Sequence, residues 1–252
     1  MQRASWLCLA MCLVLLGGAG AGELPRSFAY LQDVAPDIVQ DIRYAGPDNF
    51  TGRPVPGYEA AECILQRPVA EMLKRVQAEL QPRGLSLKVY DCYRPARATA
   101  AFMHWMVATS GPLYARHHPR VDKRRMRSLG YISASSTHSR GLAVDLTLVR
   151  LPPPAQPAFD GAASYGSCTA KVDERSPDNS LDMGTGFDCF DAQAHADAVR
   201  LSSEQRQART LLRSIMEKHG FSAYHREWWH FTFAKAVAGP ALDFVIRPSD
   251  HR

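Results

Sequence analysis

Hydrophobic and polar residues alternate along the chain with two different periods, and the longer period predicts three helices. Over residues 66–81, apolar side chains recur every three or four positions, which places them on one face of a helix. Residues 95–109 begin with a proline, which suits the first turn of a second helix. A third helix is predicted over residues 202–219, because Ser202 and Gln205 fit a capping box and Gly220 follows as a stop.

The shorter period predicts strands. Residues 85–89 alternate as in a strand with one buried face, and residues 141–149 place four apolar side chains on one face and Asp145 on the other. Residues 228–233 are rich in aromatic side chains, which favour strands. Because helices and strands are mixed without a regular βαβ alternation, we expect a single α+β domain in which helices flank a small, mostly antiparallel sheet.

Two segments lack either period. Residues 23–60 are rich in Pro, Gly, Asp and Asn, so we expect irregular structure with short strands there. Residues 151–180 are rich in Pro, Gly and Ser and are predicted to form a long loop. An Arg- and His-rich run over residues 116–127 is predicted to be a solvent-exposed helix face.

The first 21 residues have the pattern of a targeting segment. Arg3 precedes an apolar run over residues 4–16, and small residues end at Ala19-Gly20-Ala21, which fits a cleavage site. The apolar run is too short to span a bilayer comfortably. We therefore expect residues 1–21 to be a signal peptide and residues 22–252 to form the exported domain, with a periplasmic location and no membrane span after cleavage.

Composition narrows the class of protein. Hydrophobic residues make up 46% of the chain and charged residues 22%, as in ordinary globular proteins. The net charge of +5 is small and dispersed, which argues against a nucleic-acid partner.

The exported chain would keep Cys63, Cys92, Cys168 and Cys189 in an oxidising compartment. We favour the pairs Cys63–Cys92 and Cys168–Cys189 because each closes a short loop; four buried free thiols are the alternative.

Three residues distant in sequence suggest a metal site. Asp145 is flanked by Leu, Val and Ala, and a carboxylate is costly to bury there unless it is paired or bound to a metal. His138 and His230 complete a set of two imidazoles and one carboxylate, which suits catalytic Zn²⁺ with water at the fourth position. Glu227 is a candidate general base, but on an ideal strand it would face away from His230. Glu227 must therefore lie in a turn or bulge before the strand.

Each of these residues also has a structural interpretation. Taken alone, His138, Asp145 and His230 are more often structural than metal-binding, and Glu227 could be an ordinary surface acid. An H-x6-D pair by itself is weak support for a metal site. Arg94 could be a solvated residue at the start of a helix. The order and spacing of several motifs decide between these interpretations.

Five ordered segments resemble the zinc peptidases that act on bacterial cell-wall D-alanyl peptides, and in particular their D-alanyl-D-alanine dipeptidase branch, the VanX type. The segments are Asp41-Ile42-Arg43-Tyr44-Ala45 with Asp48-Asn49-Phe50-Thr51-Gly52, Asp91-Cys92-Tyr93-Arg94-Pro95, His138-Ser139-Arg140-Gly141 with Asp145-Leu146-Thr147-Leu148, Met183-Gly184-Thr185-Gly186-Phe187-Asp188, and Glu227-Trp228-Trp229-His230-Phe231. The resemblance runs from about residue 30 to 235. The stretch 152–179 is longer than we expect for the family and either covers the pocket or decorates the surface.

The resemblance implies a catalytic centre on the sheet. His138, Asp145 and His230 would hold one zinc ion per chain. Glu227 would be the general base that takes a proton from water and passes it to the leaving amine. Arg94 would stabilise the oxyanion, a contribution of about 10²–10³ in rate for such a donor.

The resemblance also implies a small D,D-dipeptide as substrate. Asp188 and Tyr44 would bind its free ammonium group, and Ser136 would contact its carboxylate. A pocket that binds both charged ends selects a free dipeptide over a longer chain. Two alternatives stay open: a D,D-carboxypeptidase that trims peptidoglycan stem peptides, and a non-catalytic zinc-containing wall-binding module. The sequence does not give the oligomeric state.

Overall fold

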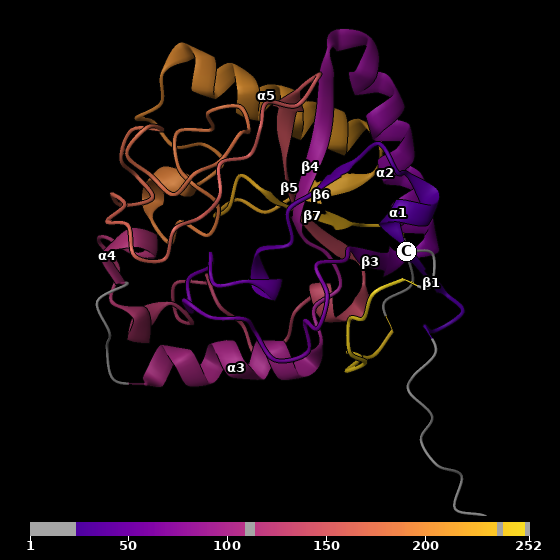
Figure 1. Cartoon of the computed structure of the whole chain (residues 1–252), viewed down its shortest axis with the longest axis horizontal. Helices are drawn as coiled ribbons and strands as arrows, with labels where there is room; N and C mark the ends of the chain where they lie inside the picture. The colour runs from indigo at the N-terminus through magenta and orange to yellow at the C-terminus, as the bar shows by residue number, and fades with distance from the viewer. Residues whose placement is uncertain (1–23, 109–113, 236–238, 250–252) are drawn as a thin grey trace, which may run out of the picture.

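The computed structural model describes residues 24–108, 114–235 and 239–249 (Figure 1). The predicted signal peptide, residues 1–21, lies outside the described residues and stays a prediction. Within the described part of the chain, no helix combines the length and the apolar character that a bilayer crossing needs.

A five-stranded sheet with strand order β2-β4-β5-β7-β6 forms the centre of the fold. Its strands are β2 (Val39–Gln40), β4 (Leu85–Asp91), β5 (Ala143–Arg150), β6 (Phe221–Ala223) and β7 (His230–Phe233). The β2–β4 pair is parallel and the other three pairs are antiparallel. A separate antiparallel pair joins β1 (Phe28–Tyr30) and β3 (Ile64–Gln66). The predicted α+β class with a mostly antiparallel sheet is confirmed.

Helices pack around this sheet. The helices are α1 (Leu31–Val34), α2 (Arg67–Leu80), α3 (Ala96–Val107), α4 (Tyr114–His117) and α5 (Ser203–Lys218). Of these, α2, α3 and α5 match the three that the hydrophobic pattern predicted, whereas the short α1 and α4 were not predicted. Helices α2 and α5 contact β4 and β5 respectively, and their C-terminal ends meet where Lys218 Nζ donates to Glu79 at 2.8 Å. Helix α3 lies apart from them, at the bottom of Figure 1.

The local signals for the helices are present in the structure. A proline occupies the first turn of α2, and the buried face of α2 includes Val69, Leu73, Val76 and Leu80. Burying each such side chain contributes about 1.5–3 kcal/mol. The capping box predicted at Ser202 and Gln205 is formed at the start of α5.

Two predictions about the strands were wrong. All seven residues of β4 are buried, where one buried face was expected. The long loop causes this: Lys88 Nζ, in the middle of β4, donates to Gln156, Asp178 and Asn179 of that loop. Strand β7 begins only at His230, so the two tryptophans before it lie in a turn.

The Arg- and His-rich run 116–127 is not a solvent-exposed helix face. Arg116, His117 and Lys123 are buried, with 8%, 7% and 5% of their surface exposed. Only its first two residues belong to a helix, the short α4, and a single turn over Lys123–Arg125 follows. The run packs into the protein because aromatic rings and the long loop cover it: the Arg116 guanidinium lies 5.0 Å from the Phe159 ring.

Both favoured disulfides are formed. Cys63 is bonded to Cys92 with a Cα–Cα distance of 5.3 Å, and Cys168 to Cys189 with a distance of 5.5 Å. Both distances are ordinary for disulfides. The pairing by short loops is confirmed, and the alternative of four free thiols is wrong.

Candidate active site

The three predicted metal ligands come from two neighbouring strands and the turn that leads into one of them. Asp145 of β5 lies directly opposite His230 of β7 in the sheet register. His138 begins a turn over His138–Arg140, and Gly141, with φ of 67°, directs the chain into β5. A Cβ atom at Gly141 would lie 2.3 Å from the Phe28 ring, so only glycine fits here.

The ligand atoms of these residues form a tight triangle. His138 Nε2 lies 3.1 Å from His230 Nδ1 and 3.3 Å from Asp145 Oδ1, and the last two atoms are 3.0 Å apart. Ligands about 2.0–2.1 Å from a tetrahedral zinc ion are themselves roughly 3.3 Å apart. The donor set and its spacing therefore fit one zinc ion.

The surrounding contacts keep these side chains in their ligand forms. His138 Nδ1 donates to the carbonyl oxygen of Cys92 at 2.7 Å, which leaves Nε2 free to face the other two ligands. Burial opposes ionisation of Asp145, yet the two imidazoles, His138 first, hold its pKa below the usual value. Burial lowers the pKa of His230 despite the adjacent carboxylate. A neutral imidazole and an ionised carboxylate are the forms that bind metal.

Glu227 lies in the turn before β7. This is the predicted position, because on a regular strand its side chain would face away from His230. Its carbonyl oxygen accepts from the His230 amide at 3.3 Å, which closes the turn. Its carboxylate Oε2 is 3.9 Å from His230 Nδ1, so the acid lies beside the ligand triangle. Burial first, and then the charges of Asp145 and Asp188, raise the pKa of Glu227 well above its ordinary value. A carboxyl group with a raised pKa can both accept and return a proton near neutral pH.

Arg94 follows strand β4 and points its guanidinium toward the triangle. Nη2 lies 3.7 Å from Asp145 Oδ2, and the guanidinium carbon lies 5.3 Å and 5.0 Å from the ring centres of Tyr44 and Phe102. Both Nε and Nη2 donate to Asp91 Oδ2, at 3.0 Å and 2.7 Å. Arg94 is thus held in place beside the predicted ligands.

Sequence reasoning missed Asp91 as a separate site residue. Its side chain is fully buried and accepts a 2.6 Å hydrogen bond from the Tyr58 hydroxyl. Its other oxygen binds Arg94 and lies 3.5 Å from His138 Nδ1. An acid at the end of an apolar strand, three residues before an arginine, was the available signal.

The predicted substrate-binding residues lie in the same region. The Tyr44 hydroxyl donates to Asp188 Oδ2 at 2.9 Å. Burial first, and then the charge of Asp145, raise the pKa of Asp188 well above its ordinary value. Ser136 precedes the turn over His138–Arg140, and its hydroxyl accepts a hydrogen bond from the His138 amide at 3.2 Å.

One cavity of about 310 Å³ brings all of these predicted residues together. The eight predicted site residues that line it are Tyr44, Arg94, Ser136, His138, Asp145, Asp188, Glu227 and His230. Tyr131, Ile132 and Tyr224 form further parts of its wall, which the sequence did not indicate. No residue of the loop 151–180 lines this cavity, so the loop covers the sheet rather than the site.

The charges around the cavity favour cations. Its lining includes the carboxylates of Asp145, Asp188 and Glu227, whereas Arg94 is the single Lys or Arg among the described lining residues. Ionised carboxylates buried without counter-charges are costly. A divalent metal ion and a substrate ammonium group would together offset this excess.

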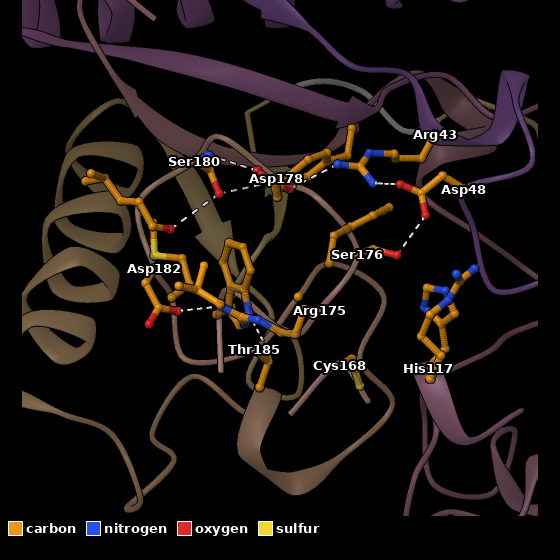
Figure 2. A pocket seen from close by; sticks show the side chains of 18 residues that line it. Arg43, Asp48, His117, Cys168, Arg175, Ser176, Asp178, Ser180, Asp182 and Thr185 are labelled. Carbon is orange, nitrogen blue, oxygen red and sulfur yellow. Dashed lines mark hydrogen bonds and ion pairs between the residues drawn. The ribbon is translucent and has the colours of Figure 1, made fainter. Parts of the chain in front are cut away.

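A second pocket lies between the long loop and the body of the protein (Figure 2). It contains none of the eight predicted site residues, and its volume of about 40 Å³ leaves room for only a few water molecules. In Figure 2, Arg43 binds Asp48 and Asp178, which ties the loop to the segment after β2. This pocket lies where the long loop is attached to the rest of the protein.

The chain is similar in sequence to known dipeptidases over most of its length. The family model described as D-ala-D-ala dipeptidase, of the M15 peptidases, matches residues 26–176 and 154–246. A D-alanyl-D-alanine dipeptidase of Enterococcus faecium is 35% identical over 222 residues, which cover 87% of this chain and 98% of the relative. The D-alanyl-D-alanine dipeptidase of Escherichia coli (strain K12) is 32% identical over 209 residues, or 83% and 86% of the two chains.

A solved structure is also similar, though more weakly. It is a mutant of the vancomycin resistance D,D-pentapeptidase VanY in complex with Zn(II), matched over 68% of this chain and 73% of that chain. The TM-score is 0.35 and the identity 13%, which is too low to carry an argument.

Proposed function

The chain belongs to the D-ala-D-ala dipeptidase family of metallopeptidases, and we propose that it hydrolyses the free dipeptide D-Ala-D-Ala with one zinc ion per chain. The family resemblance seen in the five motifs is thereby confirmed. The observation that carries the proposal is the ligand triangle of His138, Asp145 and His230, with edges of 3.0–3.3 Å, in one cavity with Glu227 and Arg94.

The chemistry divides between the metal and the side chains around it. Zinc held by the triangle would polarise the scissile carbonyl and lower the pKa of water to roughly 7. Glu227 accepts a proton from the attacking water and delivers it to the leaving amine, a role that its raised pKa supports. Arg94, fixed by Asp91, donates to the oxyanion that forms on the substrate carbonyl.

Selection of a dipeptide depends on both of its charged ends. Asp188, oriented by the Tyr44 hydroxyl, binds the substrate ammonium group. Ser136 offers a hydroxyl to the substrate carboxylate from the edge of the same cavity. A stem peptide would bring a neutral acyl group in place of the ammonium and leave the buried Asp188 carboxylate without a counter-charge, which is costly.

One competition assay tests the proposal and its main alternative. Purified protein with Zn²⁺ is incubated with D-Ala-D-Ala and, separately, with its N-acetyl form, and free D-alanine is measured. We expect release from the free dipeptide to be at least 10²-fold faster, because the acetylated form loses a charge-assisted pair. No release from a zinc-loaded protein would overturn the function, and preference for the N-acetyl form would indicate a carboxypeptidase.

We further propose that the protein is exported and acts in the periplasm. The apolar run and small-residue tract of residues 1–21 support this proposal, as do the two disulfides, which persist in oxidising compartments. N-terminal sequencing of protein from the periplasmic fraction should begin at Gly22. An intact Met1 terminus in the cytoplasmic fraction would contradict export.

A further inference from the structure

Asp188, the residue proposed to bind the ammonium group, has an unusual backbone. Its φ of 54° is the one positive value at a non-glycine position among the described residues. Few residues with a side chain adopt this conformation, although aspartate tolerates it better than most. Such a conformation persists where the surrounding structure fixes it, and it is frequent at functional sites.

His117 fixes the chain on both sides of Cys189. Its Nδ1 lies 3.2 Å from the carbonyl oxygen of Asp188, and its own carbonyl oxygen accepts from the Phe190 amide at 2.7 Å. Because a carbonyl can only accept, Nδ1 carries the proton. Burial first, and then the charge of Arg116, lower the pKa of His117 to about 3, which keeps the imidazole neutral in this role.

The Cys168–Cys189 disulfide holds the same segment from the other direction. Cys189 follows Asp188 directly, and its partner Cys168 donates its amide to Arg116 O at 2.6 Å. The Cys168 carbonyl accepts from the Gly186 amide at 2.8 Å. Figure 2 shows Cys168 and His117 on separate segments in its lower right part. Two separate segments therefore meet at the residues that flank Asp188.

We propose that His117 and the Cys168–Cys189 disulfide are positioning residues that hold the Asp188 carboxylate where it receives the substrate ammonium group, and that they thereby set the preference for free dipeptides. Neither residue 117 nor either cysteine lines the 310 Å³ cavity, so they act through Asp188. Binding groups must be held within about 0.5 Å of productive geometry by such supporting contacts. The inference rests on the proposed dipeptidase function.

The test compares D-Ala-D-Ala with N-propionyl-D-alanine, which is the same molecule with hydrogen in place of the ammonium group. The variants are His117→Phe, which removes the donor, and Cys168→Ser, which opens the disulfide. We expect kcat/KM for D-Ala-D-Ala to fall about tenfold, mainly through KM, which corresponds to about 1.4 kcal/mol. N-propionyl-D-alanine, measured as a slow substrate or as a competitive inhibitor, should be unaffected.

Matched variants separate positioning from general damage. His117→Asn places an amide N–H near the position of Nδ1 and should restore most of the lost kcat/KM. His118→Asn and Ser167→Ala alter the neighbouring residues outside the cavity and should behave like the wild type. If Cys168→Ser does not fold, the comparison of His117→Phe with His117→Asn tests the inference. An equal loss for both compounds, or no loss for either, would overturn the inference, whereas a wild type that releases no D-alanine would overturn the proposed function instead.

Discussion

Replacing Asp91 with asparagine tests whether Arg94 depends on its buried partner. Asparagine keeps an oxygen for the Tyr58 hydroxyl, which lies 2.6 Å from Asp91 Oδ1, and exchanges the Oδ2 atom that faces Arg94 for an NH₂ group. Arg94 then loses both of its charge-assisted hydrogen bonds, of 3.0 Å and 2.7 Å, and meets a donor instead. The guanidinium must move.

The size of the effect follows from that movement. A displacement of about 1 Å of a catalytic group can cost about 10²-fold in rate, and removing an oxyanion donor costs about 10²–10³-fold. We therefore expect Asp91→Asn to lower kcat about 10²-fold. Zinc should stay bound, because the His138 Nδ1 hydrogen bond goes to the Cys92 carbonyl at 2.7 Å rather than to Asp91.

The assay is steady-state release of D-alanine with zinc content measured on the same samples. Asp243→Asn is the matched control: it breaks an exposed pair with Arg97, and such pairs contribute only about 0–1 kcal/mol. We expect wild-type kinetics from this control. An unchanged kcat in Asp91→Asn would show that Arg94 does not depend on Asp91, and zinc loss that accounts for the whole decrease would show that Asp91 acts on the metal site instead.

Other variants probe separate parts of the structure. Glu227→Ala should lower kcat at least 10²-fold with zinc retained, whereas His138→Ala should lose zinc and activity together; metal analysis beside the D-alanine assay distinguishes the two. Lys88→Met should destabilise the fold by about 1.5–3 kcal/mol in denaturant unfolding, because Asp178 loses one of its two charged partners and keeps Arg43, and a loss below about 0.5 kcal/mol would contradict this. The pKa of His117 is about 3 in the fold and 6.5 unfolded, so the unfolded chain takes up the proton first as pH falls. Wild type should then lose about 2.5 kcal/mol more stability than His117→Asn between pH 7 and 4.5, and parallel curves would refute the neutral, buried histidine.

The features that the sequence predicted well depend on neighbouring residues or on ordered motifs. The capping box at Ser202 and the apolar face of α2 are local, and both are formed. The disulfide pairs followed from loop length. The resemblance to the family named eight residues that the structure brings into one cavity, although their roles stay predictions.

The predictions that failed concern the burial of side chains, which depends on segments far apart in the sequence. The alternating pattern of residues 85–89 gave no sign that the loop 151–180 covers the second face of β4 through Lys88. His117 looked like a surface residue among basic neighbours, yet it lies against Asp188, 71 positions away. Asp91 was overlooked because its importance comes from Arg94 and Tyr58, which approach it only in the folded chain.

We propose that His138, Asp145 and His230 hold the one metal ion on which dipeptide cleavage depends. The decisive experiment titrates chelator-treated protein with Zn²⁺ and follows D-alanine release from D-Ala-D-Ala. We predict that activity rises linearly and levels off at one zinc ion per chain, and that His230→Ala neither binds that ion nor regains activity. Full activity in the metal-free protein, or bound zinc at one equivalent without any release of D-alanine, would overturn the role of this metal site.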